Sequence, residues 1–297
     1  MPILKIVILA IIQGFAELLP VSSSAHVVVA EKLMGLDPSS PQMTLLLVML
    51  HTGTMFAVIA FFWNTWKQAY FSSQEAFRRF AIVVLWATVL TGVVGEAMKK
   101  LLEITFFHGA KGAEIEELFG HLEIIAPALA AVGVVILIAG LLEKRQKFGA
   151  KAGADADGRP DRLTLFQAGL MGIVQGLALP FRGFSRSGST ISTGMLIGVR
   201  KDTAERFSFA MAVVLTPAVV GLELLRLEKA AHVTSAAGVH LGASLLSSLL
   251  GMVFSFVAGL LALKWLSSWL AAGRWYLFGI YCLAASAIVY YLHTRGF

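Results

Sequence analysis

Two apolar segments of this chain are interrupted by the same short pattern. Residues 12–24, IQGFAELLPVSSS, align without gaps onto residues 174–186, VQGLALPFRGFSR. Each copy places glycine, proline and serine beside polar or charged groups within an otherwise apolar run. Interrupted hydrophobic segments at corresponding places in two halves are typical of inverted-repeat membrane proteins, where they mark the functional site. The pattern therefore predicts an inverted-topology repeat whose two breaks meet at one site.

The composition is that of a membrane protein. Hydrophobic residues make up 57% of the chain and charged residues 14%, whereas soluble domains carry about 25% charged residues. Six nearly uncharged stretches are close to the length of about 20 residues that a helix needs to cross a bilayer. They are residues 43–63, 80–98, 124–142, 207–226, 239–263 and 275–292. We therefore predict an all-α polytopic membrane protein, embedded in the lipid bilayer by about six spanning helices.

Two further apolar regions, 3–34 and 166–199, contain the interruptions. Neither half of either region is long enough to span the bilayer comfortably alone. Each region is therefore predicted to be a re-entrant helix-loop-helix segment. Irregular backbone at membrane depth is tolerated where it is buried in protein or lines a wet cavity, which fits a functional site.

The basic residues orient the chain in the membrane and do not indicate a nucleic-acid partner, although the net charge is +6. Loops 64–79 and 143–165 are rich in Lys and Arg, which predicts that both are cytoplasmic. Loop 99–123 then lies outside by alternation. The first broken segment consequently enters from the outer face and the second from the inner face.

The whole chain, 1–297, is predicted to form a single integral membrane domain. Its first repeat half covers residues 1–148 and its second half covers residues 162–297. Residues 149–161, which are rich in Gly, Ala and Asp, are predicted to be the flexible linker between the halves.

The first break carries a carboxylate, an imidazole and several hydroxyls. Gln13 and Glu17 are four residues apart and share one helix face. Pro20 then ends that helix, and the run Ser22–Ser24 can cap the next one, so capping alone is one interpretation of these serines. Glu17 is different, because an ionisable residue inside an apolar segment is costly and indicates function. His26, beyond the break, is also assigned a functional role because it follows a carboxylate and serines.

The second break, residues 182–190, has the composition of a phosphate site. Glycines such as Gly183 let the backbone approach a ligand closely. Hydroxyls and exposed N–H groups at the start of a helix predicted over 189–199 can form an anion cradle. Arg186 adds a permanent planar donor suited to phosphate oxygens. A plain helix start with a snorkelling arginine is the alternative interpretation.

Other polar groups in the apolar stretches are predicted to be structural. His51, inside 43–63, is interpreted as a hydrogen-bonded packing residue. Cys282 is the single cysteine, which excludes an intrachain disulfide, and it is interpreted as a packed thiol.

Together the two breaks bring a carboxylate, an imidazole and hydroxyls to a guanidinium and an anion cradle near mid-membrane. This set suits phosphoryl transfer, in which catalysis is mainly positioning and charge stabilisation. A substrate that reaches such a site laterally needs an apolar tail. The sequence therefore predicts a lipid phosphate or diphosphate as the substrate.

The two motifs resemble those of the bacterial undecaprenyl-diphosphate phosphatases of the bacitracin-resistance (BacA/UppP) type. That family's first motif, Glu or Gln, three residues, Glu, then Pro-Val-Ser-Ser and His, corresponds to Gln13, Glu17, residues 20–23 and His26. Its second motif, Pro-Gly-x-Ser-Arg-Ser-x-x-Thr, corresponds to residues 183–190. The family's proline is replaced here by Arg182, so the start of the second loop is expected to differ.

The resemblance implies hydrolysis of undecaprenyl diphosphate to the monophosphate, which recycles the lipid carrier for peptidoglycan synthesis. It also implies an outward-facing site in the bacterial inner membrane, a homodimer, and a dication, Mg or Ca. Glu17, helped by Gln13, is expected to position the dication or act as a base. Ser23 is the candidate nucleophile, with His26 as acid/base or as the nucleophile itself. The candidate diphosphate-binding residues are Gln13, Ser22, Gly183, Ser185, Arg186, Ser187 and Thr190.

Three other functions compete with this reading. A phosphatase of the PAP2 type needs a His and an Asp shortly after its Ser-Arg pair, but after Arg186 no His occurs before His232. A polyprenyl-phosphate transporter or flippase could bind the same headgroup with the same residues. A purely structural membrane protein leaves both polar clusters unexplained.

Overall fold

The computed structural model is all-helical over the residues that it describes. These are residues 2–37, 40–107, 121–149, 163–233, 241–271 and 273–296. They form ten α-helices and, within these ranges, no β-strand. The predicted all-α class is confirmed. Apart from residue 149, the predicted linker 149–161 lies outside the described residues.

Six of the helices are long and apolar enough to cross a membrane, as predicted. They are α3 (Pro41–Tyr70), α4 (Gln74–Phe107), α5 (Leu122–Gly149), α8 (Lys201–Val233), α9 (Leu241–Ala271) and α10 (Trp275–Thr294). Most of them extend past the predicted apolar cores, because a helix continues into flanking residues that favour it without being apolar. Large apolar side chains such as Val93, Val253 and Ile288 are exposed along these helices, which suits contact with lipid.

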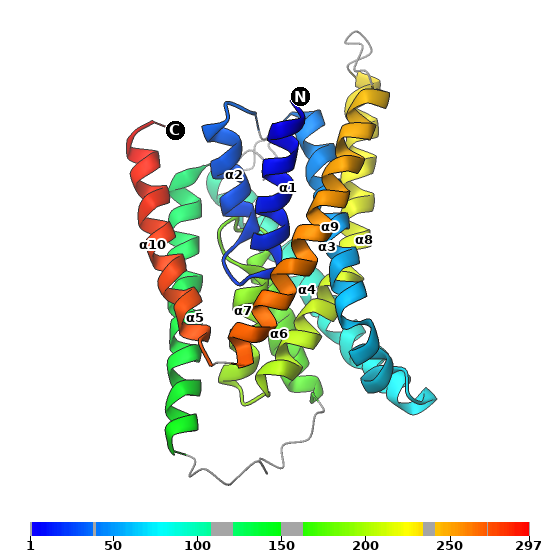
Figure 1. Ribbon diagram of the computed structural model, residues 1–297, viewed down its shortest axis with the longest axis vertical. Coiled ribbons are helices and arrows are strands. Elements are labelled where there is room, and N and C mark those ends of the chain that lie inside the picture. The colour runs from blue at the N-terminus through cyan, green and yellow to red at the C-terminus, as the bar shows by residue number, and fades with distance from the viewer. Residues whose placement is uncertain are drawn as a thin grey trace.

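The other four helices are too short to span a bilayer, which takes about 20 residues. They are α1 (Ile3–Leu18), α2 (Ser23–Leu33), α6 (Leu165–Ala178) and α7 (Arg186–Leu196). In Figure 1, α1 and α2 occupy the half of the molecule that carries both termini, whereas α6 and α7 occupy the opposite half. The turn of each pair lies toward the middle of the molecule.

Helix α7 differs from its predicted range of 189–199, since it begins at Arg186 and ends at Leu196. The reason is the hydroxyl of Ser185, which accepts a hydrogen bond from the N–H of Gly188 at 3.1 Å and caps the helix. The cap places Arg186 in the first turn of the helix.

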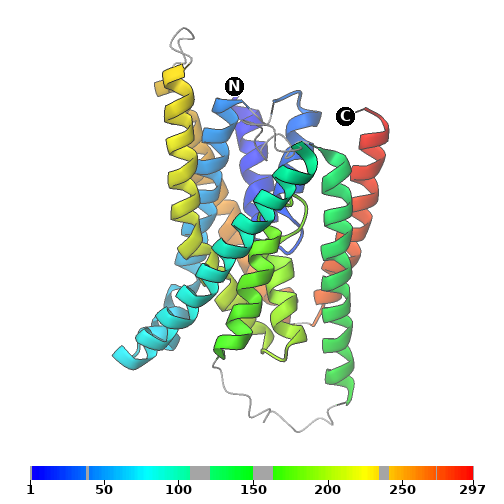
Figure 2. The ribbon, with the colours of Figure 1, turned by 180° about the vertical axis from the view of Figure 1, so that it is seen from behind.

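In each pair of short helices, a glycine lets the first helix pack closely on a long helix from the other half of the sequence. A Cβ atom at Gly14 on α1 would lie 2.9 Å from the carbonyl oxygen of Ser255 on α9. A Cβ atom at Gly176 on α6 would lie 2.7 Å from the carbonyl oxygen of Thr91 on α4. Figure 2 shows α4 crossing the back of the molecule over α6. The two glycines occupy equivalent positions of the sequence pattern, so close packing recurs with the pattern.

Candidate functional site

The two breaks contact each other directly in the structure. The backbone N–H of Gly183 donates to Ser24 Oγ at 3.3 Å, and Ser187 Oγ donates to the carbonyl oxygen of Leu19 at 3.4 Å. Gly183 has a φ of 102°, and a Cβ atom there would lie 2.5 Å from the Ile125 carbonyl oxygen. Only glycine fits this position, which brings the second loop against the first.

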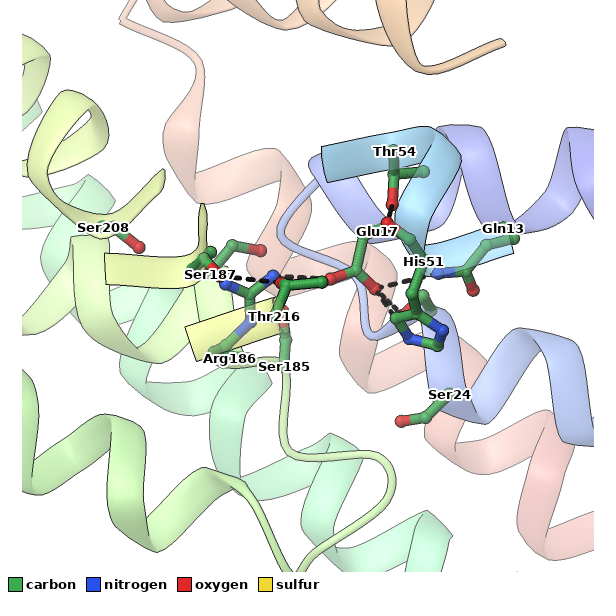
Figure 3. A network of polar contacts seen from close by, with 12 residues as sticks. Gln13, Glu17, Ser24, His51, Thr54, Ser185, Arg186, Ser187, Ser208 and Thr216 are labelled. Atoms are coloured by element: carbon green, nitrogen blue, oxygen red, sulfur yellow. Dashed lines mark hydrogen bonds and ion pairs between the residues drawn. The ribbon is translucent and has the colours of Figure 1, made fainter. Parts of the chain in front are cut away.

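The carboxylate of Glu17 is the centre of the polar network (Figure 3). Arg186 Nη2 donates to Glu17 Oε1 at 2.5 Å, and Ser23 Oγ donates to Glu17 Oε2 at 2.5 Å. Gln13 Nε2 also donates to Oε2, at 3.2 Å. The side chains of Glu17 and Arg186 are only 14% and 20% exposed, so this ion pair is largely shielded from solvent. One carboxylate thus joins the functional groups of both motifs by charge-assisted hydrogen bonds.

His51 on α3 is a member of this network that the sequence analysis assigned to packing. Its Nδ1 lies 2.8 Å from the Leu47 carbonyl oxygen, as a packing role requires. Its Nε2, however, faces Glu17 Oε2 at 3.7 Å (Figure 3), and its side chain is 43% exposed. The signal that could have identified it is an ionisable residue in a spanning stretch, the same signal that identified Glu17.

The local backbone of the first break explains how Ser23 reaches Glu17. Helix α1 ends at Leu18, just before Pro20, as predicted. Ser22 has a φ of 68°, a conformation uncommon for residues other than glycine, and its hydroxyl caps α2 by accepting from Ala25 N. This sharp reversal sends α2 back beside α1 and turns the first residue of α2, Ser23, toward the carboxylate.

The second break places its polar groups in two directions. Arg186 points across to Glu17, and Arg186 and Ser187 begin α7, where a helix cannot satisfy its own first N–H groups. Thr190 Oγ1, by contrast, lies 2.5 Å from Ser208 Oγ on α8 and is fully buried. Ser185 is buried and engaged as the helix cap. The hydroxyls of Thr190 and Ser185 therefore hold α7 in place.

His26 is oriented away from the carboxylate network. Its Nδ1 lies 2.7 Å from the Ser22 carbonyl oxygen, and its Nε2 lies 2.6 Å from Tyr281 Oη on α10. The structure thus brings Gln13, Ser23 and Arg186 onto Glu17 but places His26 beside a tyrosine that the motifs do not contain.

The described residues supply few ligands for a metal ion. No group of three or more His, Cys, Asp and Glu side chains that could hold a metal ion occurs among them. Mg²⁺, however, is commonly bound by one or two carboxylates together with substrate phosphates and water. Glu17, with the amide oxygen of Gln13, fits an ion of that kind, which would bind together with a diphosphate.

The chemistry available to this site follows from its three central groups. A hydroxyl bonded to a carboxylate is an activated nucleophile of the kind used in covalent catalysis. A guanidinium and the N–H groups of a helix start stabilise phosphate oxygens. The molecule is therefore a multi-pass helical membrane protein with one polar site built from two broken helix pairs.

Comparison with known proteins places the chain in a family. The family described as "Bacitracin resistance protein BacA" matches residues 6–288, and the chain belongs to this family. It is 55% identical over 290 residues to "Undecaprenyl-diphosphatase 2" of Acinetobacter baylyi, covering 97% of both chains. It is 34% identical over 298 residues to "Undecaprenyl-diphosphatase" of Korarchaeum cryptofilum, covering 95% of this chain and 96% of the relative. The resemblance carried by the two motifs is confirmed.

Proposed function

We propose that this chain is an undecaprenyl-diphosphate phosphatase, which hydrolyses undecaprenyl diphosphate to undecaprenyl phosphate and inorganic phosphate. The observation that carries the proposal is the joint contact of Ser23 and Arg186 with Glu17, which unites the two motifs in one site. The family and the printed names of its relatives support the same activity. Recycling of the lipid carrier for peptidoglycan synthesis and resistance to bacitracin follow from that activity.

The ion pair between Arg186 and Glu17 prepares the site for an anionic substrate. Without substrate the two charges neutralise each other, which limits the cost of holding them away from water. An arriving diphosphate offers oxygens that match the fork of the guanidinium better than one carboxylate oxygen does. Arg186 then binds phosphate, and Glu17 keeps its contact with Ser23.

In this proposal Ser23 is the nucleophile and Glu17 the base. Ser23 Oγ attacks the terminal phosphorus, its proton passes to Glu17, and the bond from phosphorus to the bridging oxygen breaks. The bridging oxygen leaves with its electron pair as part of undecaprenyl phosphate, and water then hydrolyses the phosphoserine. The hydroxyl of Ser23 is already bonded to Glu17, whereas His26 Nε2 is engaged by Tyr281, which favours Ser23 over His26 as the nucleophile. His26 serves as acid/base.

A dication, Mg or Ca, is proposed to bind with the substrate through Glu17 and Gln13. When bound, it supplies neutralisation of the phosphate charge. Arg186 and the first N–H groups of α7 hold and orient the headgroup. The loops around the headgroup are shaped by Ser22, Gly183, Ser185, Ser187 and Thr190.

The membrane arrangement is part of the proposal. We infer that α1–α2 and α6–α7 are re-entrant segments of an inverted repeat, because both pairs are short and lie in opposite halves of the molecule (Figure 1). The site opens to the periplasm of the bacterial inner membrane, in agreement with the basic loops 64–79 and 143–165 on the other side. A homodimer is proposed from the family resemblance.

The decisive test traps the intermediate. Undecaprenyl diphosphate labelled in its terminal phosphate is mixed with purified protein, the reaction is quenched with denaturant at neutral to mildly alkaline pH, where phosphoserine and phosphohistidine both persist, and the labelled residue is identified by mass spectrometry. We expect phosphoserine at Ser23, its loss in Ser23→Ala, and its retention in the matched variant Ser24→Ala. Labelled phosphohistidine at His26 would contradict the assignment.

The same preparation tests the metal and the rival transporter. Phosphate release is expected with Mg or Ca and is expected to stop with a chelator. A pure flippase would instead move labelled lipid across a liposome bilayer without releasing phosphate under any of these conditions. The joint contact of a hydroxyl and a guanidinium with one carboxylate favours hydrolysis over transport.

A further inference from the structure

Tyr281 on α10 contacts the imidazole of His26, and neither sequence motif includes it. Tyr281 Oη lies 2.6 Å from His26 Nε2, and the two rings are nearly parallel, with an interplanar angle of 11°. On the other side of the imidazole, Nδ1 lies 2.7 Å from the Ser22 carbonyl oxygen. Both ring nitrogens of His26 are therefore held, one by the first break and one by the last helix of the chain.

These two partners determine which ring nitrogen of His26 carries the proton. A carbonyl oxygen only accepts, so the proton of neutral His26 is on Nδ1 and points to Ser22. Nε2 then presents a lone pair, and the hydroxyl of Tyr281 donates to it. If His26 gains a proton, its Nε2–H donates to the same hydroxyl oxygen. Tyr281 can partner His26 in both protonation states.

Helix α10 is a rigid support for this hydroxyl. A Cβ atom at Gly279 would lie 2.6 Å from the backbone nitrogen of Leu137, so α10 packs on α5 with backbones in close approach. The residue after Tyr281, Cys282, is buried, and its Sγ lies 3.5 Å from the Pro20 carbonyl oxygen in the turn of the first break. Adjacent residues of α10 thus contact both the turn and the imidazole of the first motif.

We propose that Tyr281 is a positioning residue that holds the ring orientation in which His26, with the tautomer set by the Ser22 carbonyl, acts as acid/base in the proposed reaction. The kinetic consequences rest on the proposed phosphatase function, whereas the contact between Tyr281 and His26 does not. Side chains on rigid elements that orient an acid/base group act through that group and do not touch the substrate themselves. The effect of Tyr281 therefore has to depend on the presence of His26.

The kinetic test uses Tyr281→Phe, which keeps the ring and removes only the hydroxyl. We expect kcat to fall about tenfold while KM changes by less than about twofold, because an acid/base step is affected and headgroup binding is not. In a His26→Asn background the same change is expected to cause no further loss. Tyr290→Phe, at an exposed tyrosine of the same helix, is the matched control and is expected to leave both constants unchanged.

The spectroscopic test needs no activity. Nitrogen-15 NMR of histidine-labelled protein in detergent, with His26→Asn to assign the signal, is expected to show the Nδ1–H tautomer and a shift of the Nε2 signal in Tyr281→Phe. Any of three results would overturn the proposal. They are an unchanged kcat in Tyr281→Phe, an equal loss of kcat in the wild-type and His26→Asn backgrounds, and an Nε2 signal that Tyr281→Phe does not shift. If wild type releases no phosphate, the phosphatase function fails, and the NMR result alone decides the contact.

Discussion

The two broken segments have related sequences but carry different chemistry. In the first, Gln13 donates to Glu17 at 3.2 Å and belongs to the polar network. Its equivalent in the second, Gln175, is fully buried and donates to Thr91 Oγ1 at 3.4 Å on the neighbouring helix α4. Leu179 stands where the first segment has Glu17, and Arg186 has no equivalent cation in the first segment. The polar groups are therefore divided between the segments, with the carboxylate and the hydroxyl bonded to it in the first and the guanidinium in the second.

What the segments share is the frame that positions those groups. Each has one residue with positive φ before its second helix, Ser22 at 68° and Gly183 at 102°. Each has a glycine where its first helix packs on a long helix, Gly14 on α9 and Gly176 on α4. Backbone features therefore recur in this pattern while the polar side chains have diverged. Substitutions at equivalent positions of the two segments test this difference.

The largest difference is expected between Glu17→Gln and Leu179→Gln. Glu17→Gln removes the charge that binds Arg186 and accepts the proton of Ser23, and we expect kcat for phosphate release to fall about 1,000-fold. Leu179 is 40% exposed, so Leu179→Gln at the equivalent position is expected to change the rate less than about twofold. Lipid binding measured in parallel is expected to persist in both variants. Equal losses would mean that position 179 matters to the reaction as much as Glu17 does, and would contradict the division of polar groups between the segments.

Gly14→Leu and Gly176→Leu test the shared frame. Both side chains would be forced into the backbone of a neighbouring helix, and we expect each to lower the free energy of unfolding by about 1–3 kcal/mol. Thermal unfolding in detergent measures the effect. Gly92→Leu is the control, because no atom of the described residues, apart from the adjacent part of its own helix, lies within 4 Å of a Cβ atom placed there. A large loss at only one of the two glycines would contradict an equivalent packing role.

Gln13→Leu and Gln175→Leu compare the two glutamines, with the smallest expected effects. Gln13→Leu removes a donor from the carboxylate and is expected to lower the rate about tenfold, which corresponds to about 1.4 kcal/mol. Gln175 Oε1 is buried without a hydrogen-bond partner, so Gln175→Leu is expected to leave activity within about twofold and stability unchanged or slightly higher. A larger loss of rate in Gln175→Leu than in Gln13→Leu would show that the functional glutamine was assigned to the wrong segment.

Most of the fold and the centre of the site could be predicted from the sequence. Apolar length identified the six spanning helices, and the duplicated break identified Glu17, Ser23 and Arg186 as members of one site, because these signals are local. His51 and Tyr281 lie on α3 and α10, and their places depend on how those helices are rotated in the bundle. Sequence spacing does not determine that rotation.

Composition was also too coarse to separate ligand-facing hydroxyls from structural ones. Thr190 belongs to a stretch with the composition of a phosphate site, yet its hydroxyl faces Ser208 inside the bundle. Ser185 is the cap that sets the start of α7. Both residues belong to the motif, but the direction of each side chain depends on its place at the cap or around the helix, which composition does not record.

A double-mutant cycle between Glu17 and Arg186 tests whether the two breaks form one phosphatase site. Phosphate release from undecaprenyl diphosphate is measured for wild type, Glu17→Gln, Arg186→Gln and the double variant, all purified and shown to bind lipid. The effects of substituting residues that act as a unit are strongly non-additive. We therefore expect each single substitution to lower kcat about 1,000-fold. The rate of the double variant is expected to lie within about threefold of that of the slower single variant. Losses that multiply would show that Glu17 and Arg186 act independently and would contradict a single site.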